Sequence, residues 1–147
     1  LRIKARCLMQ ARRELEARPI YKQLLSNREH DVSLWEEAGL LAWAIEDWRG
    51  LEQCGHRVSS LAPDRSTGWT MVAVGHRAAG RYDQAEAVLI KAVACEDAQA
   101  ISWVMLATIR EMNGDLTGSM KAWQSASDLD DSLSEHLRLV DGASNGG

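Results

Sequence analysis

Side chains capable of acid–base, nucleophilic or metal chemistry occur in this chain, but none of them has a catalytic spacing. Cys54 and His56 are two residues apart, and two such residues on a helix point in different directions, so they form no nucleophile–base pair. Asp128, Asp130 and Asp131 lack the spacing of a calcium loop, and we expect solvated charge there. The four histidines are scattered, as His30, His56, His76 and His136. The sequence therefore predicts no catalytic residues, no metal site and no cofactor.

The motifs of common enzymes and of nucleic-acid-binding proteins are also missing. The chain has no phosphate-binding loop, no G-x-S-x-G, no H-E-x-x-H and no C-x-x-C. His76 falls on the packed side of a predicted helix, where we interpret it as a core histidine with a hydrogen-bond partner. The net charge of −4 argues against nucleic acid, since phosphate binding needs a basic surface. We expect neither an enzyme nor a nucleic-acid-binding protein.

Length and composition indicate a helical protein of ordinary domain size. With 147 residues, 46% hydrophobic and 26% charged, the chain is long enough to bury a core. It has two prolines and no phenylalanine, and its many Ala and Leu residues favour helices. No apolar run reaches the roughly 18 residues of a membrane span, and no signal-peptide core is found.

The cysteines and the first residue bear on location and completeness. Cys7, Cys54 and Cys95 are an odd number without a close pair, which disfavours a disulfide framework and favours a reducing compartment. We therefore expect a cytoplasmic protein. Because the chain begins at Leu1 rather than Met, inside a helical pattern, we also expect it to be a segment of a longer protein.

Charge is distributed unevenly along the chain. Residues 1–30 hold eight Lys/Arg against three Glu, a net charge of +5, and the remaining residues carry a net charge of −9. One interpretation is a solvated helix face. The other is a basic end that docks electrostatically, either on a partner or on the acidic end of a second copy.

An internal repeat organises the middle of the chain. Trp35, Trp69 and Trp103 are each 34 residues apart. The same step relates three further columns, which are Trp48, Tyr82 and Leu116, then Val58, Ala92 and Ala126, and then Gly39, Ala73 and Ala107. A fixed period of this length indicates stacked helical repeats.

Helical periodicity divides the chain into pairs of helices. Helices are predicted over 1–11, 14–27, 31–45, 48–61, 66–79, 83–95, 100–112 and 116–129. Pro19 either starts the second helix near Arg18 or kinks it. Asp31 or Ser33 is the expected N-cap of the third helix, and Asp115 that of the last. The fold predicted is all-α, a right-handed solenoid of antiparallel helix pairs.

We divide the chain into three full repeats with partial units around them. The repeats are expected at 32–65, 66–99 and 100–133, after a partial N-terminal repeat at 1–31. Residues 134–141 are expected to form a short capping segment over the exposed end of the stack, and 142–147 a disordered tail.

These residues resemble the tetratricopeptide repeat, a 34-residue helix–turn–helix. The second full unit carries the pattern in Trp69, Val72, Ala73, His76, Gly80, Tyr82, Ala85, Leu89 and Ala92. The first unit departs from it at Glu46, where Gly is expected, at Leu51, where a small residue is expected, and at Gly55, where a large one is expected. We therefore expect the second helix of that unit to pack more loosely or to tilt.

The resemblance implies a protein-binding module whose first helices line a concave groove. Helical spacing away from the packed Trp column selects the residues expected to line it. The predicted partner-binding residues are Leu40, Trp43, Met71, Val74, Met105 and Met112. Met-rich surfaces adapt to apolar partners, so an apolar peptide or amphipathic helix is the expected ligand. The alternative is that the methionines pack between adjacent units, or that a further helix fills the groove.

One subclass of this family clamps the C-terminal carboxylate of heat-shock chaperones with Lys, Asn and Arg. The corresponding positions here hold Glu36, Leu40, Met71, Ile101 and Met105, so that clamp is not expected. Other roles remain open alongside a scaffold. They are a small chaperone of the bacterial secretion type, a regulatory segment of a larger enzyme such as a glycosyl- or sulfotransferase, and self-association through the charged ends.

Overall fold

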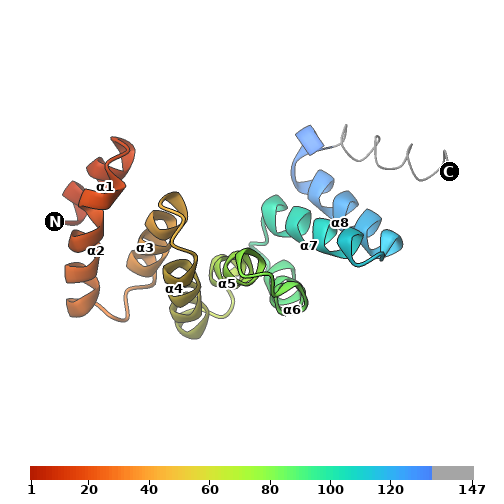
Figure 1. Ribbon diagram of the computed structural model, residues 1–147, viewed down its shortest axis with the longest axis horizontal. Helices are drawn as coiled ribbons and strands as arrows, with labels where there is room; N and C mark the ends of the chain where they lie inside the picture. Colours follow the sequence, from red (N-terminus) through yellow and green to blue (C-terminus); the bar gives the residue numbers. More distant parts are fainter. Residues whose placement is uncertain (134–147) are drawn as a thin grey trace.

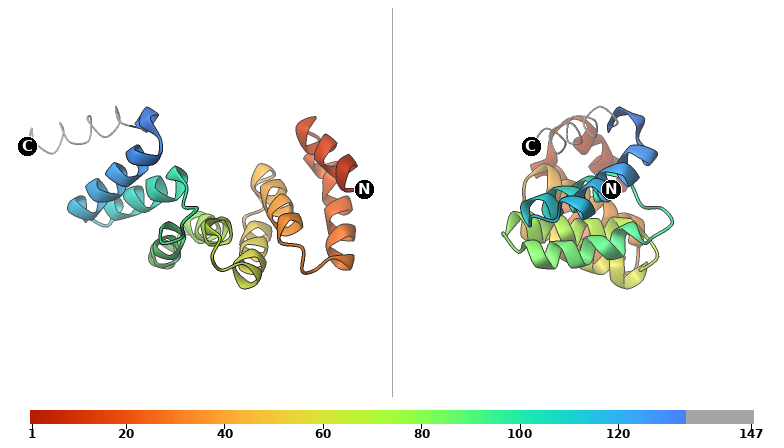
Figure 2. Two further views of the ribbon diagram at one scale, coloured as in Figure 1. Left: turned by 180° about the vertical axis from the view of Figure 1, so that it is seen from behind. Right: turned by 90° about the vertical axis from the view of Figure 1, so that its right-hand side faces the viewer.

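Paired helices stacked into an elongated row make up the part of the chain that the structure describes, residues 1–133 of a computed structural model. The helices are α1 (Arg2–Gln10), α2 (Glu14–Asn27), α3 (Val32–Ala44), α4 (Trp48–Leu61), α5 (Ser66–Ala78), α6 (Tyr82–Val93), α7 (Ala100–Met112) and α8 (Leu116–Leu129), followed by the 3₁₀ turn η1 (Asp131–Leu133). No strand occurs in these residues. Successive pairs are offset along the row and turned about it (Figures 1 and 2). The predicted all-α solenoid is confirmed.

Two sequence expectations fall on residues outside this description. The capping segment at 134–141 and the tail at 142–147 both lie beyond residue 133. Over residues 1–133, none of the helices combines the length and apolar character needed to cross a membrane.

The turn inside each helix pair has the same backbone conformation every 34 residues. Arg12, Glu46, Gly80 and Gly114 have positive φ angles of 56°, 57°, 77° and 80°. In each turn the next residue donates its N–H to a carbonyl five residues back, as Asp47 does to Ala42 at 2.8 Å and Arg81 to His76 at 2.9 Å. This arrangement closes the first helix and reverses the chain. Its presence at Arg12 gives α1 and α2 the register of the later pairs.

Aspartates fix the starts of two second helices, α4 and α8, and of the first helix α3. Asp47 Oδ1 accepts the N–H of Gly50 at 3.0 Å, and Asp115 accepts that of Gly118 at 2.9 Å. Asp31 caps α3 in the same way, through Leu34. These caps satisfy N–H groups that have no partner within the helix. Asp31 and Asp115 are thus confirmed as caps, whereas a start of α2 at Arg18 is wrong because α2 already begins at Glu14.

In α3 and α5, the Trp column joins the helix to the loop before it and to the helix after it. The indole N–H of Trp35 donates to the Glu29 carbonyl at 2.8 Å, and that of Trp69 to the Pro63 carbonyl at 2.9 Å. The Arg57 guanidinium lies 5.4 Å from the Trp35 ring, and Lys91 lies 4.9 Å from the Trp69 ring. The indole hydrogen bond and the cation–π contact over a half-buried ring therefore both repeat one unit apart.

Helices α4 and α5 approach each other more closely than side chains would allow. A Cβ placed on Gly68 would lie 2.6 Å from the Ser59 nitrogen, and one on Gly55 would lie 2.8 Å from the Gly68 carbonyl oxygen. A Cβ on Gly75, two helical turns after Gly68, would likewise lie 2.8 Å from the Cβ of Glu52. The looser packing expected of α4 is therefore wrong. Its glycines bring two backbones together, and α5 is buried through its middle as a result.

A Gly68→Ala substitution tests this contact. The new methyl group would meet backbone atoms of α4 that cannot move independently, so we expect the free energy of unfolding to fall by roughly 1–3 kcal/mol. Gly39→Ala is the matched control, since its methyl group would meet only the end of the Met71 side chain. Urea unfolding followed by circular dichroism measures both. Equal midpoints for the two variants would contradict a backbone contact at Gly68.

The positive φ at Glu46 makes a second stability prediction. A non-glycine residue is strained there, and glycine relieves the strain while adding freedom to the unfolded chain, so Glu46→Gly should stabilise the fold by about 0.5–1 kcal/mol. Gly80→Ala should lower stability by roughly 1 kcal/mol, since no atom lies near its added methyl group and only the backbone conformation resists it. The melting temperatures of both variants, compared with that of the parent, test these two expectations. A less stable Glu46→Gly protein would refute the shared turn geometry.

Candidate partner-binding site

The six predicted partner-binding residues fall into two groups in the structure. Leu40 and Met112 have exposed fractions of 58% and 64%, and Trp43 is half-buried. Met71, Val74 and Met105 are only 2% exposed and belong to the hydrophobic core. The orientation predicted for these last three, toward an open groove, is wrong. The alternative that the methionines pack between units holds for Met71, and Met105 is likewise buried in the core.

The burial of Met71 has a local cause on the neighbouring unit. A Cβ on Gly39 would lie 2.6 Å from the sulfur and methyl carbon of Met71, so the thioether occupies the space that a side chain at position 39 would fill. Helical spacing gave the correct angle for Met71 around α5, but not the neighbour that covers it. The flexible thioether suits such an irregular gap.

Two polar residues of the first helices are paired within the protein. Glu36 accepts two hydrogen bonds of 3.1 Å from Arg65, at the start of α5. The Thr70 hydroxyl is buried and lies 2.8 Å from that of Ser102, which links α5 to α7. The surface of the first helices is therefore interrupted at α5, whereas α1, α3 and α7 keep exposed apolar side chains.

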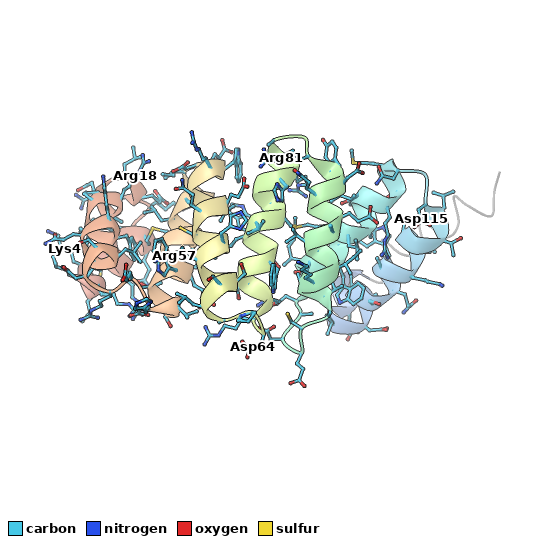
Figure 3. All side chains as sticks on the ribbon, turned by 90° about the horizontal axis from the view of Figure 1, so that it is seen from below. Lys4, Arg18, Arg57, Asp64, Arg81 and Asp115 are labelled. Atoms are coloured by element: carbon cyan, nitrogen blue, oxygen red, sulfur yellow. The ribbon has the colours of Figure 1, made fainter. Side chains whose placement is uncertain are left out.

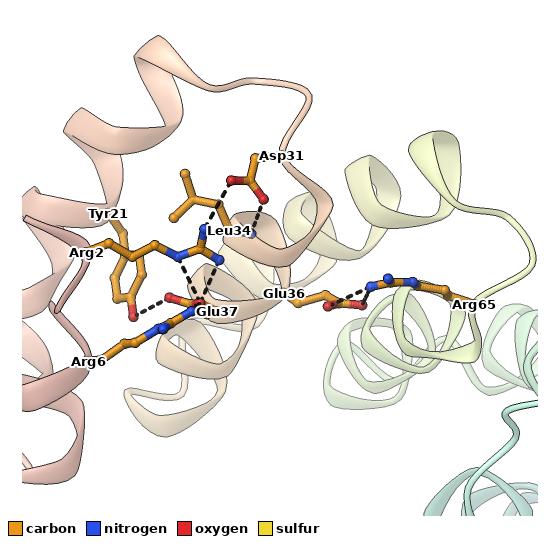
Figure 4. A network of polar contacts seen from close by, with 8 residues as sticks. All are labelled: Arg2, Arg6, Tyr21, Asp31, Leu34, Glu36, Glu37 and Arg65. Carbon is orange, nitrogen blue, oxygen red and sulfur yellow. Dashed lines mark hydrogen bonds and ion pairs between the residues drawn. The ribbon is translucent and has the colours of Figure 1, made fainter.

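Glu37 is the centre of a network that joins α1 to α3 (Figure 4). Its Oε1 accepts hydrogen bonds from Arg2 Nη2 at 2.7 Å and from Arg6 Nη2 at 2.5 Å. Its Oε2 accepts the Tyr21 hydroxyl at 3.2 Å, and Arg2 also donates to Asp31 at 3.1 Å. The first helix is thus attached to α3 by charge-assisted hydrogen bonds, which are stronger than neutral ones.

The network fixes the charge state of its members. Burial alone would raise the pKa of Glu37, but the hydrogen bonds from Arg6 and Arg2 outweigh it and hold the pKa below its ordinary value. Burial, helped by the carboxylate of Glu37, raises the pKa of Tyr21 to about 12. At neutral pH the site therefore contains an ionised carboxylate, two cations and an un-ionised phenol.

A small cavity opens beside this network, between α1 and α3. It has a volume of about 230 Å³ and is lined by Arg6, Met9, Gln10, Tyr21, Glu37 and Leu40. This is below the roughly 300–1,000 Å³ of typical small-molecule sites. The cavity accommodates a side chain of a bound peptide rather than a whole metabolite. Leu40 stands at its edge as the exposed apolar residue.

Sequence reasoning missed the network, although part of its signal was present. Arg2 and Arg6 are four residues apart and therefore share one helix face. Glu37 has the helical angle of a groove residue, and nothing in its own surroundings indicates that two arginines from 31 and 35 residues earlier meet it. Only the stacking of α1 on α3 brings them together.

The titratable groups elsewhere form no catalytic arrangement in the described residues. His76 accepts a hydrogen bond on Nδ1 from Arg81 at 2.9 Å, so the expected partner of this histidine is found. Burial lowers the pKa of His76 and raises that of Cys54 to about 11, so both groups are neutral at pH 7. No group of three His, Cys, Asp or Glu that could hold a metal ion occurs over residues 1–133.

Comparison with known proteins agrees with the geometry. No family model matches the chain. Over 82 residues, 56% of its length, it is 30% identical to the tetratricopeptide repeat-containing protein trd-1 of Caenorhabditis elegans. The matched residues make up only 9% of the length of that relative.

Two solved structures show the fold over most of the chain. A MamA structure from Desulfovibrio magneticus RS-1 superposes with a TM-score of 0.79 and 20% identity, covering 98% of this chain and 83% of that one. The first tetratricopeptide repeat domain of Spaghetti (RPAP3), bound to the HSP90 peptide SRMEEVD, gives 0.66 and 16%, covering 76% and 91%.

The stacked helix pairs define a helical-repeat protein. More specifically, the 34-residue period, the turns and the comparisons show that the chain has the fold of tetratricopeptide-repeat proteins. The resemblance stated from the sequence is confirmed.

Glu37→Gln tests the network through its pH dependence. In the folded protein the pKa of Glu37 lies below its ordinary value of 4.5, so the unfolded chain binds the proton first on acidification. The stabilisation is therefore complete above about pH 4.5 and is lost as the pH falls through the folded-state pKa. We expect the variant to be less stable by about 1–3 kcal/mol at pH 7, and the difference between the two proteins to shrink as the pH falls through the folded-state pKa of Glu37.

Urea unfolding at pH 7 and at pH 3 measures this difference. Glu16→Gln is the control, because Glu16 pairs with Arg13 at 2.6 Å on the exposed surface of α2. Such a pair contributes little to stability, so this variant should behave as the parent at both pH values. A gap between Glu37→Gln and the parent that persisted unchanged at low pH would show that the carboxylate charge is not what joins α1 to α3.

Proposed function

We propose that this chain is a non-enzymatic scaffold that binds an apolar peptide segment or an amphipathic helix at the surface of α1 and α3. The observation that carries the proposal is Leu40, a leucine with 58% of its surface exposed beside a cavity of about 230 Å³. Trp43 and Met112 are the further predicted contacts with accessible surface. Exposed apolar side chains beside a side-chain-sized cavity favour anchoring by an apolar residue of a partner.

The charge around the cavity favours an apolar anchor over an acidic one. Arg2 and Arg6 are the nearby cations, and both already donate to Glu37. An incoming carboxylate would have to compete with this internal carboxylate and leave it buried without its partners, which is unfavourable. The peptide bound by the Spaghetti (RPAP3) domain is acidic at its end, and the proposed ligand of this chain differs from it in that respect.

Leu40→Glu tests the proposal. Peptides selected from a random phage-display library on the full chain would be synthesised, and their affinities measured by fluorescence anisotropy. Placing a carboxylate beside Glu37 at the apolar anchor point should weaken the selected peptides by roughly tenfold or more, because an apolar contact is replaced by a charge.

Leu116→Glu is the matched control. Leu116 has an exposed fraction of 59%, almost equal to that of Leu40, but lies at the first turn of α8 away from the cavity. A glutamate there is compatible with the helix N-terminus, and peptide affinity should not change. If both variants bound the peptides as tightly as the parent, the surface around Leu40 would not be the binding site.

A further inference from the structure

A second and larger cleft lies on the other side of α3, between α2 and α4. Its volume is about 620 Å³, and it is open to solvent. The floor comes from α3, through Ala38, Leu41, Ala42 and Ile45. Ala42 and Leu40 are two residues apart and therefore point to different sides of the helix, so the floor of this cleft faces away from Leu40, and Tyr21 is the residue that lines both the cleft and the small cavity.

The 34-residue register allows this junction to be compared with the next, where two separate cavities of about 560 Å³ each are found. The positions on α2 and α3 that correspond to Gly55, Gly68 and Gly75 are Tyr21, Leu34 and Leu41. At α4 and α5 the three glycines bring the backbones into contact. At α2 and α3 three large side chains fill the same places, so α2 is held away from the row behind it. The opening is thus built into the sequence.

The shape of the cleft suits a helix. Its walls, α2 and α4, have 14 residues each, which corresponds to about 21 Å of helix and four turns. The lining is mainly apolar, with Leu25 and Ile45 half-buried and the ring of Trp35 at one end. A long, open and apolar channel between two helices is the geometry in which an amphipathic helix buries its apolar face.

Charges at the rim of the cleft determine which side chains a bound helix should carry beside its apolar face. Arg18 pairs with Asp47 at 3.3 Å, and Arg57 pairs with Glu29 at 3.9 Å (Arg18 and Arg57 are labelled in Figure 3). The second oxygen of Asp47 caps α4. Lys22 is exposed and has no carboxylate partner among the described residues. The rim therefore carries a net charge of +1 that is concentrated at Lys22 and complements an acidic side chain.

We propose that the cleft between α2 and α4 is a second docking site, which binds an amphipathic helix of a partner protein through an apolar stripe and an acidic residue next to Lys22. The site differs in position from the one around Leu40, and it also differs in charge preference. Because it lies on the other side of α3, the same chain holds two different partner segments at its basic end.

A helical-peptide selection tests this second site. A display library of 14-residue peptides, with apolar residues at helical spacing and randomised flanking positions, is selected on the full chain. Selected peptides should carry Glu or Asp on one flank. Lys22→Glu should weaken them roughly threefold to tenfold, because an attractive surface pair becomes a repulsive one. Ile45→Glu should weaken them further, because it places a charge in the apolar floor.

Controls separate this site from the first and from general charge effects. Lys121→Glu makes the same charge change at an exposed position of α8 and should leave affinity unchanged. Leu40→Glu should also leave it unchanged. Replacing the acidic residue of a selected peptide by Gln should weaken binding to the parent but not to Lys22→Glu, which is a double-mutant cycle for the pair.

The outcomes distinguish the two proposed sites. Peptides sensitive to Lys22→Glu and insensitive to Leu40→Glu establish the cleft. Peptides whose binding is weakened by Leu40→Glu alone contradict the proposed cleft site and support the site around Leu40. A selection that returns no helical peptide dependent on Lys22 overturns it as well. Lys22 is exposed and its substitution cannot unfold the core, so a loss of affinity in that variant reports on the cleft itself.

Discussion

The contact between the α4 and α5 backbones at Gly55 and Gly68 is the constraint on which the other features of the molecule depend. It makes α5 a central helix that is buried through its middle, and this burial removes Met71 and Val74 from the surface. An uninterrupted groove along the first helices is therefore absent from the described residues. Accessible apolar surface remains on α3 and α7, on either side of the central helix.

Features that depend on local sequence could be predicted. The period of 34 residues is visible in the Trp column, and it sets the helix pairs and their turns. The turn geometry even persists at Arg12 and Glu46, where no glycine signals it, because the hydrogen bonds of the closing motif and the stacking of the flanking helices outweigh the strain of a positive φ. Aspartate caps were predictable for the same reason, since each acts on its own helix.

Features that depend on contacts between units could not be predicted in this way. Helical spacing gives the direction of Met71 from its axis, but Gly39 on another helix decides whether that direction leads to solvent or to a gap in the core. Glu37 likewise has the spacing of a groove residue, and its partners Arg2 and Arg6 are known only once α1 is placed. Gly55 was interpreted as a weakness because its counterpart Gly68 belongs to the following unit.

The two sides of α3 show how one register can produce two chemically different surfaces. On the side of Glu37, the arginines of α1 are already neutralised, so what remains for a partner is the apolar surface around Leu40. On the side of Ala42, Asp47 and Glu29 form ion pairs with Arg18 and Arg57. The charge that remains unpaired there is that of Lys22, above an apolar floor. Because an ion pair made within the fold removes both charges from recognition, the unpaired residue rather than the number of charged residues determines the preference of each surface.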